Sequence, residues 1–137
     1  MNCKYLCFLK YMLFFNLVTA SQENFKGPSF TTEPPSQVDF SNSTGAKIEC
    51  SATGVPAPIV TWVRADGSTV SDVAKLRQVL RGGTLKFYPF FAEDYRQDIH
   101  AVVYKCVATN PVGTIVSRDV KVRGEISKND KKSPTLL

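Results

Sequence analysis

The sequence contains few of the residues that catalysis and metal binding require. Its 137 residues include one histidine and four cysteines. His100 is the single imidazole that a Ser-His-Asp or Cys-His arrangement could use as a base, so we interpret it as a structural residue between a loop and a strand. No His/Cys cluster is present, and Glu93, Asp94 and Asp98 lack the glycine-centred spacing of a calcium loop. We therefore predict no enzymatic activity, no catalytic residue, no metal site and no cofactor.

A strong excess of one charge is also lacking. The chain has 17 basic and 12 acidic side chains, for a formal net charge of +5. Lys4 and Lys10 belong to the predicted signal peptide described below, and without them 15 basic and 12 acidic side chains remain. A nucleic-acid-binding domain concentrates basic residues on one face. The mild imbalance of this chain therefore argues against a nucleic-acid partner.

The sequence has no apolar run long enough to cross a membrane. A transmembrane helix needs about 20 apolar residues, whereas the apolar stretch at residues 5–18 is shorter and is interrupted by Lys10. Basic Lys4 and Lys10, the apolar segment 11–18 and the small residues at 18–20 instead predict a signal peptide over residues 1–20. An uncleaved membrane anchor is the alternative.

Two cysteines remain once the predicted signal peptide, with Cys3 and Cys7, is removed. An even pair in an exported chain indicates one disulfide, between Cys50 and Cys106. These two cysteines frame Trp62, and Tyr104 lies two residues before Cys106. This spacing predicts an all-β, immunoglobulin-like antiparallel sandwich of two sheets, with one inter-sheet disulfide against the tryptophan. Closing the loop between the cysteines should stabilise the fold by roughly 4 kcal/mol.

Short alternating runs separated by turn residues place one domain over residues 28–123. Residues 21–27 are predicted to be a flexible leader, and the polar, aperiodic residues 124–137 a disordered tail. A helical turn is expected within residues 92–100. In the final strand, residues 114–123, we expect Val116, Val120 and Val122 to face the core.

Three strings identify more than the fold class: residues 33–54 (EPPSQVDFSNSTGAKIECSATG), 76–80 (LRQVL) and 92–97 (AEDYRQ). The chain resembles the first immunoglobulin domain of the arthropod Down syndrome cell adhesion molecule family over roughly residues 27–123. This resemblance implies an I-type sandwich in a cell-surface receptor for homophilic adhesion, axon guidance in neurons and immune recognition. It also implies protein partners, namely other cell-surface immunoglobulin domains including copies of the same receptor.

One departure from the wider immunoglobulin pattern concerns the corner before the second cysteine. Many such domains have an aspartate six residues before that cysteine, where this chain has His100. The ion pair that this aspartate usually forms with an arginine therefore cannot form there. Asp94 or Asp98, paired with Arg77 or Arg81, are the alternatives.

Asn42 lies in the sequence Asn-Ser-Thr, which is an acceptor for N-glycosylation in an exported chain. The surrounding residues 41–45 have the composition of a turn. We therefore expect a glycan at Asn42, and an ordinary turn asparagine is the alternative.

The strand phasing leaves four apolar side chains outside the core, and they form the candidate protein interface: Tyr88, Phe91, Tyr95 and Ile115. Outward aromatic residues are enriched at interfaces. The alternative is that Phe91 or Tyr95 closes the corner of the sandwich.

Together these observations predict an extracellular immunoglobulin domain that binds protein, either secreted or on the outer face of the plasma membrane as part of a longer receptor. A secreted single-domain immune factor that binds microbial or glycan ligands is the alternative. A spacer that packs on neighbouring domains is a third possibility.

Overall fold

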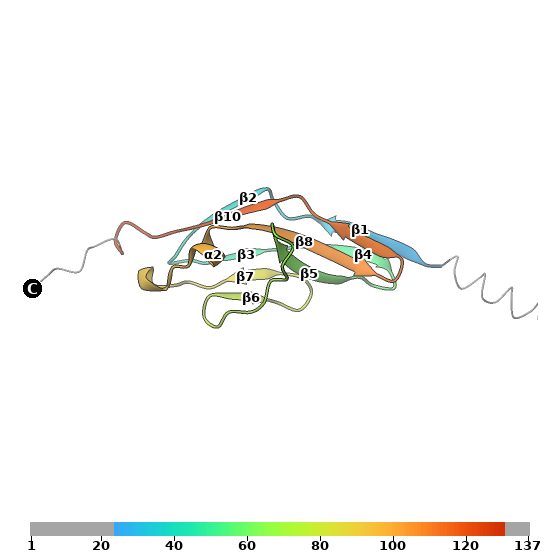
Figure 1. Ribbon diagram of the computed structural model, residues 1–137, viewed down its shortest axis with the longest axis horizontal. Helices are drawn as coiled ribbons and strands as arrows, with labels where there is room; N and C mark the ends of the chain where they lie inside the picture. The colour runs from blue at the N-terminus through green and yellow to red at the C-terminus, as the bar shows by residue number, and fades with distance from the viewer. Residues whose placement is uncertain (1–23, 131–137) are drawn as a thin grey trace, which may run out of the picture.

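The computed structural model describes residues 24–130 and shows an elongated sandwich (Figure 1). The predicted signal peptide and residues 131–137 lie outside the described residues. The described elements are, in chain order, β1 (Lys26–Thr32), β2 (Gln37–Ser41), β3 (Ala46–Ile48), β4 (Ser51–Val55), β5 (Ile59–Arg64), β6 (Arg77–Val79), β7 (Leu85–Phe87), the 3-10 turn η1 (Ala92–Asp94), α2 (Gln97–His100), β8 (Val103–Asn110), β9 (Gly113–Val116) and β10 (Val120–Glu125).

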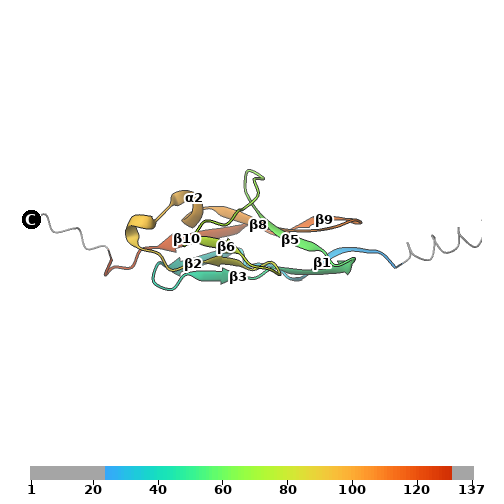
Figure 2. The same ribbon diagram turned by 90° about the horizontal axis from the view of Figure 1, so that it is seen from below.

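The strands form two layers, which confirms the predicted all-β immunoglobulin-like fold. One sheet has the order β2-β10-β8-β5, with β9 paired to β8, and the other has the order β3-β7-β6. β1 and β4 pair separately, and β4 follows β3 after only two residues. Figure 2 shows β1 and the β9 hairpin at one end of the molecule and the helical corner at the other.

The core lies around the predicted disulfide, which is confirmed: Cys50 and Cys106 are joined, with their Cα atoms 6.5 Å apart. Trp62 pairs in register with Cys106 and is completely buried. Its indole N–H donates a hydrogen bond of 2.7 Å to the backbone oxygen of Gly83. Gly83 has φ +106°, and an added Cβ would lie 2.5 Å from the backbone oxygen of Cys50. This turn therefore needs glycine in order to seat the tryptophan against the cystine.

The predicted domain boundaries are too narrow at both ends. β1 begins at Lys26, inside the expected leader, because its backbone pairs with β4 at Val55. β10 extends to Glu125, inside the expected tail, because it pairs in parallel with β2 as far as Ser41. Apolar periodicity does not reveal these ends, since backbone pairing orders them.

Candidate interaction surfaces

The corner beside Cys106 is closed by a buried arginine and a tyrosine, not by an ion pair. The Arg77 guanidinium donates to the backbone oxygen of Ser71 at 2.8 and 3.1 Å and to the Tyr104 hydroxyl at 3.1 Å. The Tyr104 hydroxyl in turn donates to the backbone oxygen of Ile99 at 2.8 Å. Burial raises the pKa of Tyr104, and the hydrogen bond from Arg77 opposes that rise.

The carboxylates proposed for this corner are used elsewhere or not at all. Asp98 forms an ion pair of 2.7 Å with Arg96, whose hydrogen bond lowers the pKa of Asp98. Within residues 24–130, no ion pair involves Arg77, Arg81 or Asp94. The expected substitute pair is therefore wrong, and carbonyl and hydroxyl oxygens satisfy the buried guanidinium instead.

His100 lies completely buried at the end of α2. Its Nδ1 accepts a hydrogen bond of 3.0 Å from the backbone N–H of Arg96. The imidazole stacks on Phe90, with ring centroids 4.0 Å apart, and on Tyr95, with centroids 5.5 Å apart. Its Nε2 has no hydrogen-bond partner among the described residues, and burial lowers the pKa of His100. The site favours a neutral imidazole.

The side chain of Asn42 is buried and fully hydrogen-bonded, which argues against the expected glycan. Its Nδ2 donates to the backbone oxygen of Phe90 at 3.0 Å and to Asp130 at 2.8 Å. Its Oδ1 accepts from the backbone N–H of Ser127 at 2.9 Å. A glycan would replace one of the two Nδ2 hydrogens, and both are in use. Asn42 instead holds residues 127–130 against the domain.

The four side chains of the candidate interface do not share one surface. Phe91, 73% exposed, and Tyr95, 37% exposed, lie around η1 at the helical corner. Tyr88 is half-buried, hydrogen-bonded to Gln78, and lines a separate groove of about 750 Å³ beside β6. Ile115 pairs with Ala108, which is completely buried, so Ile115 faces inward. The expected outward position of Ile115 is therefore wrong.

A one-residue bulge between β9 and β10 explains this reversal. Val107 of β8 lies opposite Val116, whereas Tyr104 lies opposite Val120, so the last strand uses one residue more than β8 over this interval. Because successive side chains alternate between faces, one extra residue reverses the phase. Val120 faces the core as expected, but Val116 points outward and is 54% exposed.

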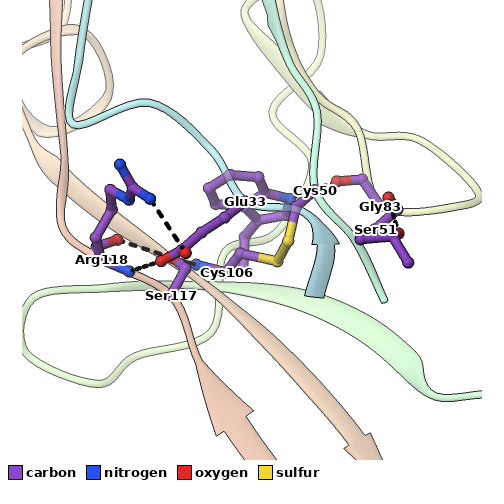
Figure 3. Close-up of a disulfide and its surroundings, with 9 residues drawn as sticks. Glu33, Cys50, Ser51, Gly83, Cys106, Ser117 and Arg118 are labelled. Atoms are coloured by element: carbon purple, nitrogen blue, oxygen red, sulfur yellow. Dashed lines mark hydrogen bonds and ion pairs between the residues drawn. A yellow bond between two sulfur atoms is a disulfide. The ribbon is translucent and has the colours of Figure 1, made fainter. Parts of the chain in front are cut away.

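The bulge is held by polar contacts beside the cystine (Figure 3). The Ser117 hydroxyl accepts from the backbone N–H of Cys106 at 2.9 Å and donates to the backbone oxygen of Arg118 at 2.8 Å. Glu33 accepts from the backbone N–H of Arg118 at 2.9 Å and from its guanidinium at 3.2 Å. These hydrogen bonds lower the pKa of Glu33.

The bulge completes an outward surface that the sequence interpretation missed. Six side chains on three adjacent strands form it, and we name it the β-branched face: Ile59, Thr61, Val107, Thr109, Thr114 and Val116. In the register, Ile59 is opposite Thr109, and Thr109 is opposite Thr114. None of the six is charged, and Ile59 is 71% exposed. The sequence signal was present, because residues 59–61, 107–109 and 114–116 have no charged side chain on either face.

The other half of this sheet is charged. An open groove of about 720 Å³ lies along β2 and β10, and Asp39, Lys121, Arg123 and Glu125 are among its lining residues. Asp39 accepts a hydrogen bond from Gln37, and Arg123 pairs with Glu125 at 3.4 Å. The charged lining of this groove, along β2 and β10, thus contrasts with the β-branched face on β5, β8 and β9 of the same sheet.

The described residues contain neither a metal-binding cluster nor a membrane-spanning helix. Residues 24–130 contain no group of three or more His, Cys, Asp or Glu side chains that could hold a metal ion. In the same part of the chain, no helix has the length and apolarity needed to cross a membrane.

Comparison with known proteins places the sequence beside a set of adhesion molecules. The family described as immunoglobulin domain matches residues 27–110. Cell adhesion molecule Dscam1 of Drosophila melanogaster is 55% identical over 103 residues, which are 75% of this chain and 5% of that protein. Cell adhesion molecule Dscam2 of the same organism is 48% identical over 134 residues, which are 95% of this chain and 6% of that protein. The chain therefore spans only a small part of the length of these relatives.

Solved structures of immunoglobulin domains from adhesion molecules also match this chain. The crystal structure of the N-terminal four Ig domains of Dscam1 isoform 7.44 superposes with a TM-score of 0.75 at 55% sequence identity. The match covers 76% of this chain and 27% of that one. The eight-domain structure of isoform 1.30.30 matches with a TM-score of 0.74, over 75% of this chain and 15% of that one.

Proposed function

Because this chain belongs to the immunoglobulin domain family, we propose that it is an extracellular domain of a cell-adhesion receptor that acts by binding other copies of the receptor. The observation that carries this proposal is the 55% and 48% identity to two proteins named cell adhesion molecules. The domain itself supplies a rigid scaffold, in which the cystine and Trp62 fix the two sheets and the outer faces remain available for contact.

The proposed action is surface complementarity without catalysis. The single imidazole, His100, is buried and stacked on aromatic rings, where it cannot reach a substrate. The two cysteines of the described domain are joined in the disulfide. At the corner, Arg77 and the Tyr104 hydroxyl are hydrogen-bonded to each other and to backbone oxygens. Their arrangement does not present an activated nucleophile.

The test is cell aggregation with the receptor that contains this domain. Long-read sequencing of the transcript shows whether further immunoglobulin domains are encoded in frame with residues 24–130. Non-adherent cells that express the receptor should aggregate with one another, and cells that express a receptor lacking these residues should aggregate less. Dispersed cells would contradict the proposal. A transcript encoding one secreted domain that binds microbial glycans would support the soluble immune factor instead.

A further inference from the structure

Two lysines face each other on the outer side of the sheet formed by β3, β7 and β6 (Figure 1). Lys47 is directly opposite Lys86 in the register, and both point outward because their neighbours Ile48 and Phe87 are buried. Directly opposed side chains in a sheet have Cβ atoms about 5 Å apart, and like charges at that distance repel. Within residues 24–130, neither lysine forms an ion pair with a carboxylate. The folded domain therefore keeps a repulsion that a bound anion would relieve.

The Lys86 ammonium is held in place by an aromatic ring. It lies 4.4 Å from the centre of the Tyr88 ring, which is a cation–π contact. The Tyr88 hydroxyl donates to the side-chain oxygen of Gln78, and Gln78 lies opposite Lys86 in the register. Lys47, Lys86 and Gln78 thus form a row across three strands, which we name the lysine row. An ammonium group fixed in this way loses less conformational freedom when it binds a ligand.

The groove of about 750 Å³ beside β6 adjoins the lysine row. Tyr88 and Gln78 line it, and so do residues 72–75 of the loop before β6. Lys75 of this loop is exposed, and it forms no ion pair within the described part of the chain. Its backbone has φ +68°, a left-handed conformation that lysine rarely adopts. Residues held in such a conformation cluster at ligand-binding sites.

The acidic side chains on this side of the domain do not cancel its positive charge. Asp72 lines the groove, but its carboxylate already accepts a hydrogen bond of 2.9 Å from the backbone N–H of Val79. Glu49 is exposed two residues after Lys47, and it makes no ion pair with any described residue. Three lysines against two carboxylates leave the surface positive.

We propose that the lysine row and the adjoining groove bind a sulfated polysaccharide chain, a ligand class that goes beyond the adhesive function proposed above. A lysine ammonium binds sulfate or phosphate as a point charge, so one sulfate group lying between Lys47 and Lys86 would relieve their repulsion. The disulfide indicates a domain exported from the cell, where sulfated polysaccharides occur.

The walls of the groove suit a sugar ring better than an acidic peptide. Val73, Ala74, Pro89 and the Tyr88 ring contribute apolar surface, and the Gln78 amide contributes a polar group. A sugar ring has an apolar face and hydroxyl groups at its edge, so it can satisfy both kinds of wall at once. An acidic peptide matches the charge of the lysines but brings no rigid ring to the Tyr88 wall.

The exposure of the site predicts weak, salt-dependent binding. Exposed charges are screened beyond about 8 Å at physiological ionic strength. We therefore expect a dissociation constant of about 10–100 µM at low salt for one short oligosaccharide, and weaker binding as the salt concentration rises. A long polysaccharide repeats the same unit many times, so receptors clustered on a membrane would bind it with avidity.

Calorimetric titration of the full chain with a heparin-derived sulfated hexasaccharide tests the site. Lys47→Gln and Lys86→Gln should each weaken binding at least about threefold, and the double variant should weaken it further. Lys121→Gln is the matched control, because it removes the same charge from an exposed position on the other sheet, and it should bind like the unaltered chain. Equal losses in Lys121→Gln and Lys47→Gln, or no binding at about 1 mM in low salt, would overturn the proposal.

Thermal melting separates a binding role from a structural one. Lys47→Gln removes the repulsion, so at low salt it should melt at the same temperature as the unaltered chain or higher while it binds less. Lys75→Gly relieves the left-handed backbone and should keep a similar melting temperature with weaker binding. A lower melting temperature with unchanged affinity in Lys47→Gln would show that this lysine is structural, which contradicts the proposal. Full affinity in Lys75→Gly would contradict the part given to the groove.

Two further ligands identify what the site recognises. The desulfated hexasaccharide should bind at least about tenfold more weakly than the sulfated one, and a polyglutamate peptide of equal charge should also bind more weakly. In an NMR titration with the sulfated hexasaccharide, the backbone amides of Lys47, Gln78 and Tyr88 should shift, whereas that of Lys121 should not. Equal binding of polyglutamate would overturn the assignment to a polysaccharide, and shifts confined to β2 and β10 would overturn the site.

Discussion

The hydroxyl oxygen of Ser117 accepts a hydrogen bond of 2.9 Å from the backbone N–H of Cys106. The backbone N–H of Ser117 donates back to the oxygen of Cys106 at 2.8 Å. This reciprocal pair attaches the bulge of the last strand to the strand that carries the disulfide. The Ser117 hydroxyl is therefore one of the contacts that hold the bulge, together with this backbone hydrogen bond and the contacts between Glu33 and Arg118.

Ser117→Ala should destabilise the domain by about 1–3 kcal/mol, because it leaves the buried N–H of Cys106 without an acceptor. Ser117→Thr retains the hydroxyl and should cost less. Chemical denaturation gives the free energy of unfolding, and hydrogen exchange at the Cys106 amide should become faster only in the alanine variant. Equal stability of Ser117→Ala and the unaltered chain would show that the bulge is held by backbone contacts alone.

Cys50→Ser should cost roughly 4 kcal/mol, because the unfolded chain is no longer constrained by a link across 56 residues. For a domain of this size that is a large part of the total stability, so secretion should fall steeply. The amount of secreted protein and its melting temperature measure the effect. Cys3→Ser, within the predicted signal peptide, is the control and should be secreted normally. Near-normal secretion of Cys50→Ser would contradict the role given to the disulfide.

Residue spacing was enough to predict the sandwich and its cystine, because Cys50, Trp62 and Cys106 must meet wherever such a fold forms. The orientation of Val116 and Ile115 could not be predicted in the same way. Strict alternation over residues 114–123 places Val116 inward and Ile115 outward, and a bulge has no apolar signature. The polar run at residues 117–119 was the only local sign of it.

The glycosylation motif at Asn42 shows the same limit of prediction from local sequence. The acceptor sequence is correct, but the pattern contains no information about Asp130 or Ser127, which lie more than 80 residues away. Those long-range contacts decide whether the amide is free.

The secreted chain should carry no glycan at Asn42. Thr44→Ala removes the acceptor sequence but loses only two exposed hydrogen bonds of the threonine hydroxyl, so mass and mobility should not change beyond the substitution itself. Asn42→Ala should instead destabilise the domain by about 2–3 kcal/mol, because it removes the hydrogen bonds to Phe90, Asp130 and Ser127. Intact-mass spectrometry and thermal melting measure the two effects. A glycan-sized loss of mass in Thr44→Ala would show that the amide is modified before the domain closes.

His100 should make the stability of the domain sensitive to mild acid. Burial lowers its pKa below the ordinary value of 6.5, so the folded state binds the proton less readily than the unfolded state. The stability that the neutral imidazole provides is therefore complete above about pH 6.5 and declines as the pH falls below it toward the lowered pKa. Protonation would also remove the acceptor for the N–H of Arg96. Arg77 and Arg96 oppose the new charge, and Asp98 favours it.

His100→Gln keeps a side-chain acceptor but cannot titrate, so its free energy of unfolding should be nearly constant between about pH 4.5 and pH 6.5, where that of the unaltered chain falls. Denaturation at several pH values within this window gives the comparison. Below it, the lowered pKa values of Glu33, Asp98 and Asp130 cause a second loss that both proteins share, because those carboxylates must then be protonated. Parallel pH curves for the two proteins across the window would mean that the imidazole is solvated, and that stacking on Phe90 and Tyr95 does not exclude its charged form.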